Sequence, residues 1–290
     1  MNKKVLLLGD TGMLGQSIRK VFEGRGYTVV GVSRTSKDYA IDLTCDDSIK
    51  ATIREEKPDM VINSAAIVSL DGCENNPADA YMINGRLPGI VAECCRETDT
   101  YFIQISTDHY FMGDGDGKHK EDDKVIIVNE YARSKYIGER LTLAYDNSLV
   151  VRTNVVGFRG RGADTFVEWI IKCMDNKEEM SLFTDFYTSS INSKDFAKVL
   201  ADVVEKKVTG LINIASSEVR NKKDFILGLA EEIYGYQPIY TEKSIHFAAK
   251  TKRADSIGLD TSYVESIVGY KMPDFKETIK SIADEYRQLS

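Results

Sequence analysis

A tyrosine and a lysine four residues apart, Tyr131 and Lys135, are the side chains of this sequence best suited to acid–base chemistry. On a helix, residues at this spacing lie on one face, one turn apart. An ammonium group near a phenol favours the phenolate, and so lowers the tyrosine pKa from its ordinary value of about 10. The phenol could then protonate a substrate oxygen near neutral pH. Because the chain has 15 tyrosines, the spacing also arises by chance, and neighbouring motifs must decide its meaning.

The first such motif is the glycine-rich run Gly9-Asp-Thr-Gly12-Met-Leu-Gly15, which follows an apolar run and opens a helical pattern. Glycines in a strand-to-helix turn let the backbone approach a pyrophosphate, and the helix N-terminus offers free N–H groups and a positive dipole end. We therefore expect a dinucleotide here, although a purely structural turn has the same appearance. The second motif, Ser106-Thr107-Asp108, stands at the end of a predicted strand.

The cofactor type should depend on Ser33-Arg34, where the second predicted strand ends. This position lacks the acidic residue that would bind an NAD ribose hydroxyl, and a basic side chain can instead pair with a 2′-phosphate. A solvated surface arginine is the alternative interpretation. Asp42 and Leu43 could flank an adenine ring. The small residues of Asn63-Ser-Ala-Ala66 would suit a cofactor that crosses the strand ends, or only close packing.

The composition excludes several classes of protein. A net charge of −7 argues against binding nucleic acid over a broad surface, and no apolar run reaches the 18 or so residues of a membrane span. The N-terminal apolar run stops at Leu8, so we expect a first strand rather than a signal peptide, and a cytoplasmic protein. The five cysteines form no CxxC pair and the three histidines do not cluster with them, which predicts free thiols and no metal.

Apolar runs alternate with helical patterns along the first two thirds of the chain, as in repeated βαβ units with a parallel sheet. After residue 152 the alternation is irregular, and the C-terminal third is mainly helical. The predicted strands are 4–8, 27–32, 60–63, 101–105, 149–152 and 211–215. The predicted helices are 14–22, 46–56, 78–96, 131–145, 166–174, 223–234, 263–268 and 275–289.

Taken in order, these motifs make the chain resemble the extended short-chain dehydrogenases/reductases, and within them the dTDP-4-dehydrorhamnose reductase family of sugar-nucleotide-binding proteins. Further matching positions are Glu121, Gly138-Glu139 and Arg152-Thr153. The resemblance implies an α/β fold with a Rossmann-type doubly wound parallel sheet and a smaller C-terminal α/β lobe. We expect residues 1–158 and 189–215 to form the NAD(P)-binding domain, and 159–188 and 216–290 to form the substrate-binding lobe.

The same resemblance implies a role for each catalytic residue. Thr107 would hydrogen-bond the substrate carbonyl, Tyr131 would donate the proton, and Lys135 would bind the nicotinamide ribose and favour ionisation of Tyr131. NADP(H), or alternatively NAD, would be the cofactor. Its expected contacts, besides Tyr131 and Lys135, are Gly9, Thr11, Gly12, Met13, Leu14, Gly15, Ser33, Arg34, Asp42, Leu43, Ala65 and Ala66.

The substrate would be a nucleotide sugar bound by Thr107, Asp108, Asn154 and Val155. Val155 stands where the family usually has a tryptophan, so we expect a wider pocket beside the sugar ring. Any of Arg152, Arg159 and Arg161 could contact the diphosphate of the nucleotide sugar, because guanidinium groups suit phosphate. The alternative interpretation is that these arginines are surface charges on a polar loop.

The predicted function is NAD(P)H-dependent reduction of a nucleotide-activated 4-keto-6-deoxy sugar, in a monomer or homodimer. Two alternatives stay open. One is a non-catalytic NADP-binding regulatory subunit, like the beta subunit of methionine adenosyltransferase, which resembles the same reductases. The other is a sugar-nucleotide epimerase, although no additional acid or base for that reaction is identifiable.

Overall fold

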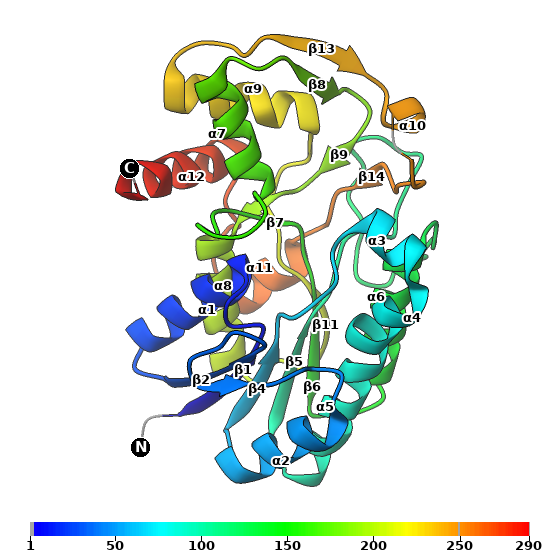
Figure 1. Cartoon of the computed structure of the whole chain (residues 1–290), viewed down its shortest axis with the longest axis vertical. Helices are drawn as coiled ribbons and strands as arrows, with labels where there is room; N and C mark the ends of the chain where they lie inside the picture. The colour runs from blue at the N-terminus through cyan, green and yellow to red at the C-terminus, as the bar shows by residue number, and fades with distance from the viewer. Residues whose placement is uncertain (1–2, 249, 290) are drawn as a thin grey trace. The chain divides into compact units, whose positions relative to one another are not determined.

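Short runs of valine, leucine and isoleucine form a seven-stranded sheet in the computed structural model, which describes residues 3–248 and 250–289. Its strand order is β11-β6-β5-β4-β1-β2-β3 (Figure 1). The strands are β1 (Lys4–Leu8), β2 (Thr28–Ser33), β3 (Tyr39–Ala40), β4 (Met60–Asn63), β5 (Tyr101–Ile105), β6 (Ser148–Arg152) and β11 (Gly210–Asn213).

The sheet confirms the predicted Rossmann-type fold. β1 pairs in parallel with both β2 and β4, and the parallel pairing continues through β5 to β6. The strands β2 and β3 therefore lie on one side of β1, and β4, β5 and β6 lie on the other side. In sheets of this kind, ligands bind beyond the carboxyl ends of the strands at the place where the strand order reverses, here between β1 and β4. Both faces of the sheet are covered, which is why all residues from Val5 to Leu8 are buried.

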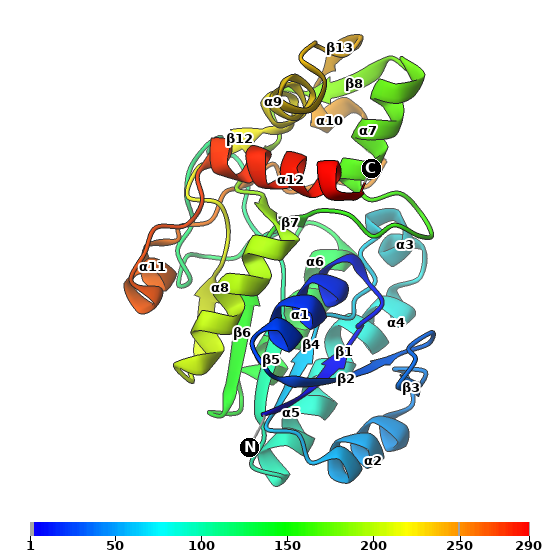
Figure 2. The same cartoon turned by 90° about the vertical axis from the view of Figure 1, so that its left-hand side faces the viewer.

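Helices cover the two faces of this sheet (Figures 1 and 2). One face carries α1 (Met13–Gly24) and α8 (Ser193–Glu205), and the other carries α2 (Asp46–Glu56), α5 (Leu87–Glu97) and α6 (Glu130–Thr142). Arg25, which follows α1, donates a hydrogen bond of 2.6 Å to Asp202 of α8. The sequence analysis assigned no helix to 193–205, although Phe196, Leu200 and Val203 have helical spacing and are buried there.

The predicted continuous helix 78–96 is wrong in its middle. The structure has α4 (Pro77–Ala80), then a π-helical turn over Tyr81–Arg86, and then α5. The side chain of Asn84 in this turn is buried and makes two hydrogen bonds of 2.9 Å to the backbone N–H and carbonyl of Ile67. Such tertiary bonds, which helical periodicity cannot reveal, accompany the wider turn. The short α3 (Leu70–Asn75) lies between β4 and α4.

The chain forms two compact units. The first holds the seven-stranded sheet and comprises residues up to 107, 127–152 and 197–212. The second comprises 108–126, 153–196 and the residues from 213 on. The expected boundaries, 1–158 with 189–215 and 159–188 with 216–290, remain a prediction about domains.

The second unit has its own hydrophobic core, to which α7, α9 and α12 contribute buried side chains. Small sheets surround it: β8 pairs with β13, β7 with β10, and β9 with both β12 and β14. None of the helices in the described part of the chain has the length and apolar character that a membrane crossing needs. The bounds are β7 (Val155–Val156), α7 (Phe166–Asn176), β8 (Met180–Phe183), β9 (Tyr187–Thr188), β10 (Ile191–Asn192), β12 (Arg220–Asn221), α9 (Lys222–Tyr234), β13 (Tyr240–Lys243), α10 (Ile245–Ala248), β14 (Ser256–Ile257), α11 (Ser262–Val268) and α12 (Phe275–Leu289).

Candidate active site and cofactor cavity

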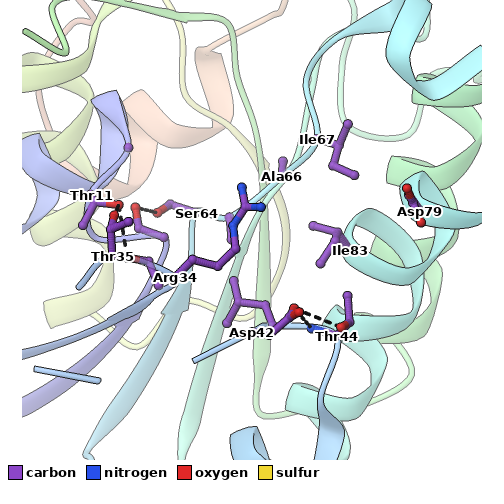
Figure 3. A pocket seen from close by; sticks show the side chains of 15 residues that line it. Thr11, Arg34, Thr35, Asp42, Thr44, Ser64, Ala66, Ile67, Asp79 and Ile83 are labelled. Atoms are coloured by element: carbon purple, nitrogen blue, oxygen red, sulfur yellow. Dashed lines mark hydrogen bonds between the residues drawn. The ribbon is translucent and has the colours of Figure 1, made fainter. Parts of the chain in front are cut away.

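A cavity of about 850 Å³ lies in the first unit, at the carboxyl ends of β1, β2 and β4 (Figure 3). This is the edge at which an open α/β sheet binds its ligand. Many of the residues expected to bind the cofactor line it, namely Gly9, Thr11, Gly12, Ser33, Arg34, Asp42, Leu43, Ala65 and Ala66.

The glycine-rich loop has the geometry that its sequence predicts. Gly9 has a φ of +82°, which only glycine adopts without strain. A Cβ atom on Gly15 would lie 2.1 Å from the carbonyl oxygen of Gly9, so the loop and the helix can approach this closely only without a side chain. Gly12 is the N-cap of α1, and as a glycine it has no side chain with which to cap the first N–H groups of the helix. Such a helix end suits a phosphate group. Met13, Leu14 and Gly15 form that first turn and are not among the cavity-lining residues.

Hydroxyl groups and one guanidinium group gather where β2 ends. Thr11 Oγ1 lies 3.1 Å from Ser33 Oγ and 3.4 Å from Thr35 Oγ1. Figure 3 shows the exposed Arg34 side chain extending into the middle of the cavity. Within the described residues, its guanidinium group makes no hydrogen bond or ion pair, whereas neighbouring Arg19 binds both Asp10 and Asp38. This combination of hydroxyl donors and a free cation suits a phosphate group.

The opposite wall of the cavity includes residues that the sequence analysis did not identify. Ile67 directly follows Ala66, and Thr44 directly follows Leu43. Both Ala66 and Leu43 are predicted cofactor contacts, so the sequence already indicated this part of the wall. Asp79 of α4 and Ile83 of the π-helical turn had no such local signal, because their place depends on how the π-helical turn packs (Figure 3). Thr35 is a further lining residue without a prediction, and Ser64 belongs to the predicted run of small residues from Asn63 to Ala66.

The catalytic candidates Tyr131 and Lys135 lie one turn apart on α6, as predicted from their spacing. Asn129 begins this helix by accepting a hydrogen bond of 2.8 Å from the backbone N–H of Ala132. Tyr131 and Lys135 are only 8% and 4% exposed. Lys135 Nζ donates a hydrogen bond of 2.7 Å to the carbonyl oxygen of Ile105, two residues before the buried Thr107. Helix α6 is thereby fixed to the end of β5.

Burial lowers the pKa of Lys135 to about 8, while Glu139 acts in the opposite direction by favouring the charged form. Lys135 is therefore still largely protonated at neutral pH. An ammonium group has three N–H donors, and the bond to Ile105 engages one of them.

Arg152 is not available to a diphosphate, which corrects one of the expectations from the sequence. It is 3% exposed and donates hydrogen bonds of 2.9 to 3.3 Å to both carboxylate oxygens of Glu139, which is 1% exposed. A buried, bidentate ion pair of this kind is costly to separate. Arg159 and Arg161 lie in a loop of the second unit, where Arg159 donates to the carbonyl oxygen of Ala163.

The residues expected to bind the sugar lie in the second unit, apart from Thr107. Asn154 donates a hydrogen bond of 2.8 Å to the buried Asp108 and accepts one of 2.8 Å from Ser190. Val155, next in sequence, begins β7. Lys222 joins this group, because its Nζ lies 3.4 Å from Ser190 Oγ, and burial lowers its pKa to about 8. The sequence analysis did not identify Lys222.

Comparison with known proteins gives the relationship of this chain. The profile of the family described as "RmlD substrate binding domain" matches residues 3–288. A "Probable low-salt glycan biosynthesis reductase Agl14" of Haloferax volcanii is 28% identical, and the match covers 97% of this chain and 98% of the relative. The dTDP-4-dehydrorhamnose reductase of Escherichia coli is 23% identical, with 97% of each chain covered.

Solved structures resemble the fold over nearly its whole length. A dTDP-4-dehydrorhamnose reductase of Bacillus anthracis in complex with NADP has a TM-score of 0.88 at 21% identity, covering 98% of this chain and 100% of that one. An orthologue from Clostridium acetobutylicum has a TM-score of 0.86 at 25% identity, covering 98% and 99%. Because the family profile spans almost the entire sequence, this chain belongs to the RmlD substrate binding domain family, within the extended short-chain dehydrogenases/reductases.

Proposed function

We propose that this protein is an NAD(P)H-dependent reductase of a nucleotide-activated 4-keto-6-deoxy sugar. The observation that carries the proposal is the arrangement of Tyr131 and Lys135 on α6, with Lys135 bonded to the strand end that leads into Thr107. Relatives named as dTDP-4-dehydrorhamnose reductases, and one such structure in complex with NADP, support the same activity.

The cavity fits a dinucleotide phosphate cofactor. The uncapped N-terminus of α1 suits a pyrophosphate, and Arg34 with the hydroxyls of Thr11, Ser33 and Thr35 suits a 2′-phosphate. Asp42, Leu43, Ala65 and Ala66 would surround the adenosine half. We therefore assign NADP(H) as the preferred cofactor, with NAD as a weaker ligand. A bound dihydronicotinamide would supply the reducing equivalent to the keto carbon.

The protein would supply the proton and hold the carbonyl group. Tyr131 would donate its phenolic proton to the carbonyl oxygen, and the Thr107 hydroxyl would donate a hydrogen bond to that oxygen. Lys135, charged below about pH 8, would favour the phenolate form of Tyr131 and so make it a stronger acid at neutral pH.

Asp108, Asn154 and Val155 would contact the sugar. The oligomeric state, monomer or homodimer, stays a prediction. We place the protein in the cytoplasm, since its cysteines are free thiols.

The proposal is tested by assaying a panel of nucleotide-linked 4-keto sugars, including dTDP-4-dehydrorhamnose, with NADPH. Tyr131→Phe should lower turnover of the accepted sugar about 100-fold or more, because it removes the general acid, while NADPH still binds. Steady-state assays measure the turnover, and calorimetry measures the binding of NADPH. Wild-type turnover by Tyr131→Phe would remove this residue from the mechanism.

The same panel separates the proposal from its alternatives. NADPH binding without turnover of any keto sugar would favour a regulatory subunit, and interconversion of sugars without net NADPH oxidation would favour an epimerase. Because Val155 replaces the usual tryptophan, we expect a bulkier or differently substituted sugar to be accepted besides or instead of dTDP-4-dehydrorhamnose. If dTDP-4-dehydrorhamnose were the best substrate of the panel, this expectation about the pocket would be wrong.

A further inference from the structure

We propose that Glu139 is a positioning residue of the catalytic site, which fixes the backbone before Thr107 and sets the charge around Lys135. This inference rests on the proposed function, since it assigns Glu139 a task in the same reaction. Glu139 would touch neither substrate nor cofactor, and would act through Ser106, Lys135 and Arg152.

The hydrogen bonds of α6 to β5 carry the geometric part of the proposal. Lys135 Nζ donates to the carbonyl oxygen of Ile105 at 2.7 Å, and Ser106 Oγ donates to Glu139 Oε1 at 2.6 Å. Two side chains one helical turn apart thus bind two consecutive residues at the end of β5, and Thr107 is the next residue. Tyr131 lies on the same face, one turn before Lys135. These two bonds therefore join the backbone immediately before Thr107 to the helix that carries Tyr131.

The burial of the Glu139–Arg152 pair indicates a purpose beyond stability. Both side chains are less than 4% exposed, and removing two charges from water costs much of what their attraction returns. A pair of apolar side chains would fill the same space without that cost. The pair provides what apolar residues cannot: a carboxylate whose spare acceptor capacity binds Ser106, and a negative charge one turn from Lys135.

Several other charged groups on the elements packed against α6 pair with described residues other than Lys135. Glu74 of α3 accepts a hydrogen bond from the backbone N–H of Glu130, and Asp79 of α4 lines the cavity. Arg86 of the π-helical turn pairs with Asp46, and Glu93 and Glu97 of α5 pair with Lys50 and Arg54 of α2. Among the described residues, the charged group that acts on the pKa of Lys135 is Glu139, which favours the charged form against the larger effect of burial. Glu139 itself is paired with Arg152 of β6.

The first experiment measures the ionisation of Lys135 directly, without substrate. Protein labelled with ¹³C-lysine is titrated by NMR, and the Lys135 signal is assigned from its absence in Lys135→Arg. Glu139→Gln removes a neighbouring negative charge at nearly constant shape, so the Lys135 titration should move to lower pH by about one unit or more. Arg152→Gln removes a positive charge instead, so in this variant the titration of Lys135 should stay at the wild-type pH or move to higher pH.

The second experiment measures NADPH oxidation with the sugar accepted in the panel, or with dTDP-4-dehydrorhamnose. Glu139→Gln should lower kcat about 10- to 100-fold with little change in KM, because positioning is lost while binding is retained. The alkaline limb of its pH profile should move to lower pH together with the Lys135 titration. Glu139→Asp, which keeps the charge, should restore the position of that limb.

A milder variant covers the case in which the buried charges are needed for folding. Ser106→Ala removes one hydrogen bond and leaves the ion pair intact, so kcat should fall about 10-fold or more while the pH profile keeps its place. Wild-type kcat in Ser106→Ala would overturn the geometric half of the proposal. Equal pH profiles for Glu139→Gln, Arg152→Gln and the wild type would overturn the electrostatic half.

These outcomes are separable from failure of the proposed function. If no sugar is reduced but the Lys135 titration moves as expected, the electrostatic half of the proposal stands and the reaction assignment is wrong. If a sugar is reduced and the titration of Lys135 is the same in all variants, the reaction assignment stands and the electrostatic half is wrong.

Discussion

The side chain that we expect to distinguish NADPH from NADH is Arg34. It is exposed and extends into the cavity (Figure 3), and within the described residues it has no ion-pair partner. Its charge is nevertheless felt nearby, since it contributes, after the hydrogen bonds from Thr44, to lowering the pKa of Asp42. A cation in this position would be suited to a ligand phosphate.

We expect Arg34→Ala to weaken NADPH binding by about 1.5–3 kcal/mol, which is about tenfold or more, because a charge-assisted bond to the 2′-phosphate is lost. NADH has no such phosphate, and its affinity should stay unchanged. Isothermal calorimetry with both cofactors measures the ratio. Lys37→Ala removes another exposed charge of the same loop and serves as the control. An unchanged ratio in Arg34→Ala would refute the 2′-phosphate assignment.

At the scale of elements, two helices do most to build the site. Helix α6 carries Tyr131, Lys135 and Glu139 on one face, and α1 presents its uncapped N-terminus to the cavity. The contact of α1 with the preceding loop depends on the absence of a side chain at Gly15. At Gly24, the other end of the same helix, an added Cβ atom would meet only open space, so this glycine makes no such contact.

Gly15→Ala should therefore displace the glycine-rich loop, lower the melting temperature and weaken NADPH binding at least about tenfold, the usual consequence of closing a ready-made phosphate site. Gly24→Ala should leave NADPH binding unchanged and change the stability by no more than about 1 kcal/mol, in the stabilising direction, because alanine favours the helix. Differential scanning fluorimetry and calorimetry check both. Wild-type NADPH affinity in Gly15→Ala would show that the loop does not hold the phosphates.

At the scale of the whole molecule, the predicted contacts are divided between two units. The cofactor cavity, Tyr131, Lys135 and Thr107 belong to the first unit, whereas Asp108, Asn154 and Val155 belong to the second. Each unit has a separate hydrophobic core, one around the sheet and one around α7, α9 and α12. The cofactor should therefore stabilise the first unit without needing the sugar substrate.

NADPH at 100 times its dissociation constant should stabilise the native state by about 2.7 kcal/mol, since it binds the folded protein and not the unfolded chain. The melting temperature should rise by several degrees, and if scanning calorimetry resolves two transitions, only one should move. The same NADPH concentration should produce a smaller rise in Arg34→Ala. No rise in the wild type would exclude the cavity as a cofactor site.

Local patterns determined much of this protein. The bounds of β1, β4, β5, α2 and α12 are those predicted from apolar runs and helical spacing, because burial on a sheet or against a helix imposes a local periodicity. The spacing of Tyr131 and Lys135 likewise placed both residues on one helical face. The order of the motifs was sufficient to predict the family, and with it the parallel sheet.

Only the tertiary structure decided which partners the charged groups have. Arg152 was available to a phosphate as far as the sequence showed, but it is buried against Glu139, 13 residues away in sequence. Asp79 and Ile83 reach the cavity through a π-helical turn whose Asn84 binds the backbone of Ile67. Side-chain pairing and burial depend on residues distant in the chain, which no local periodicity encodes. The sequence therefore determines the fold and the candidate reacting groups, and the packing determines which charges lack a partner among the described residues.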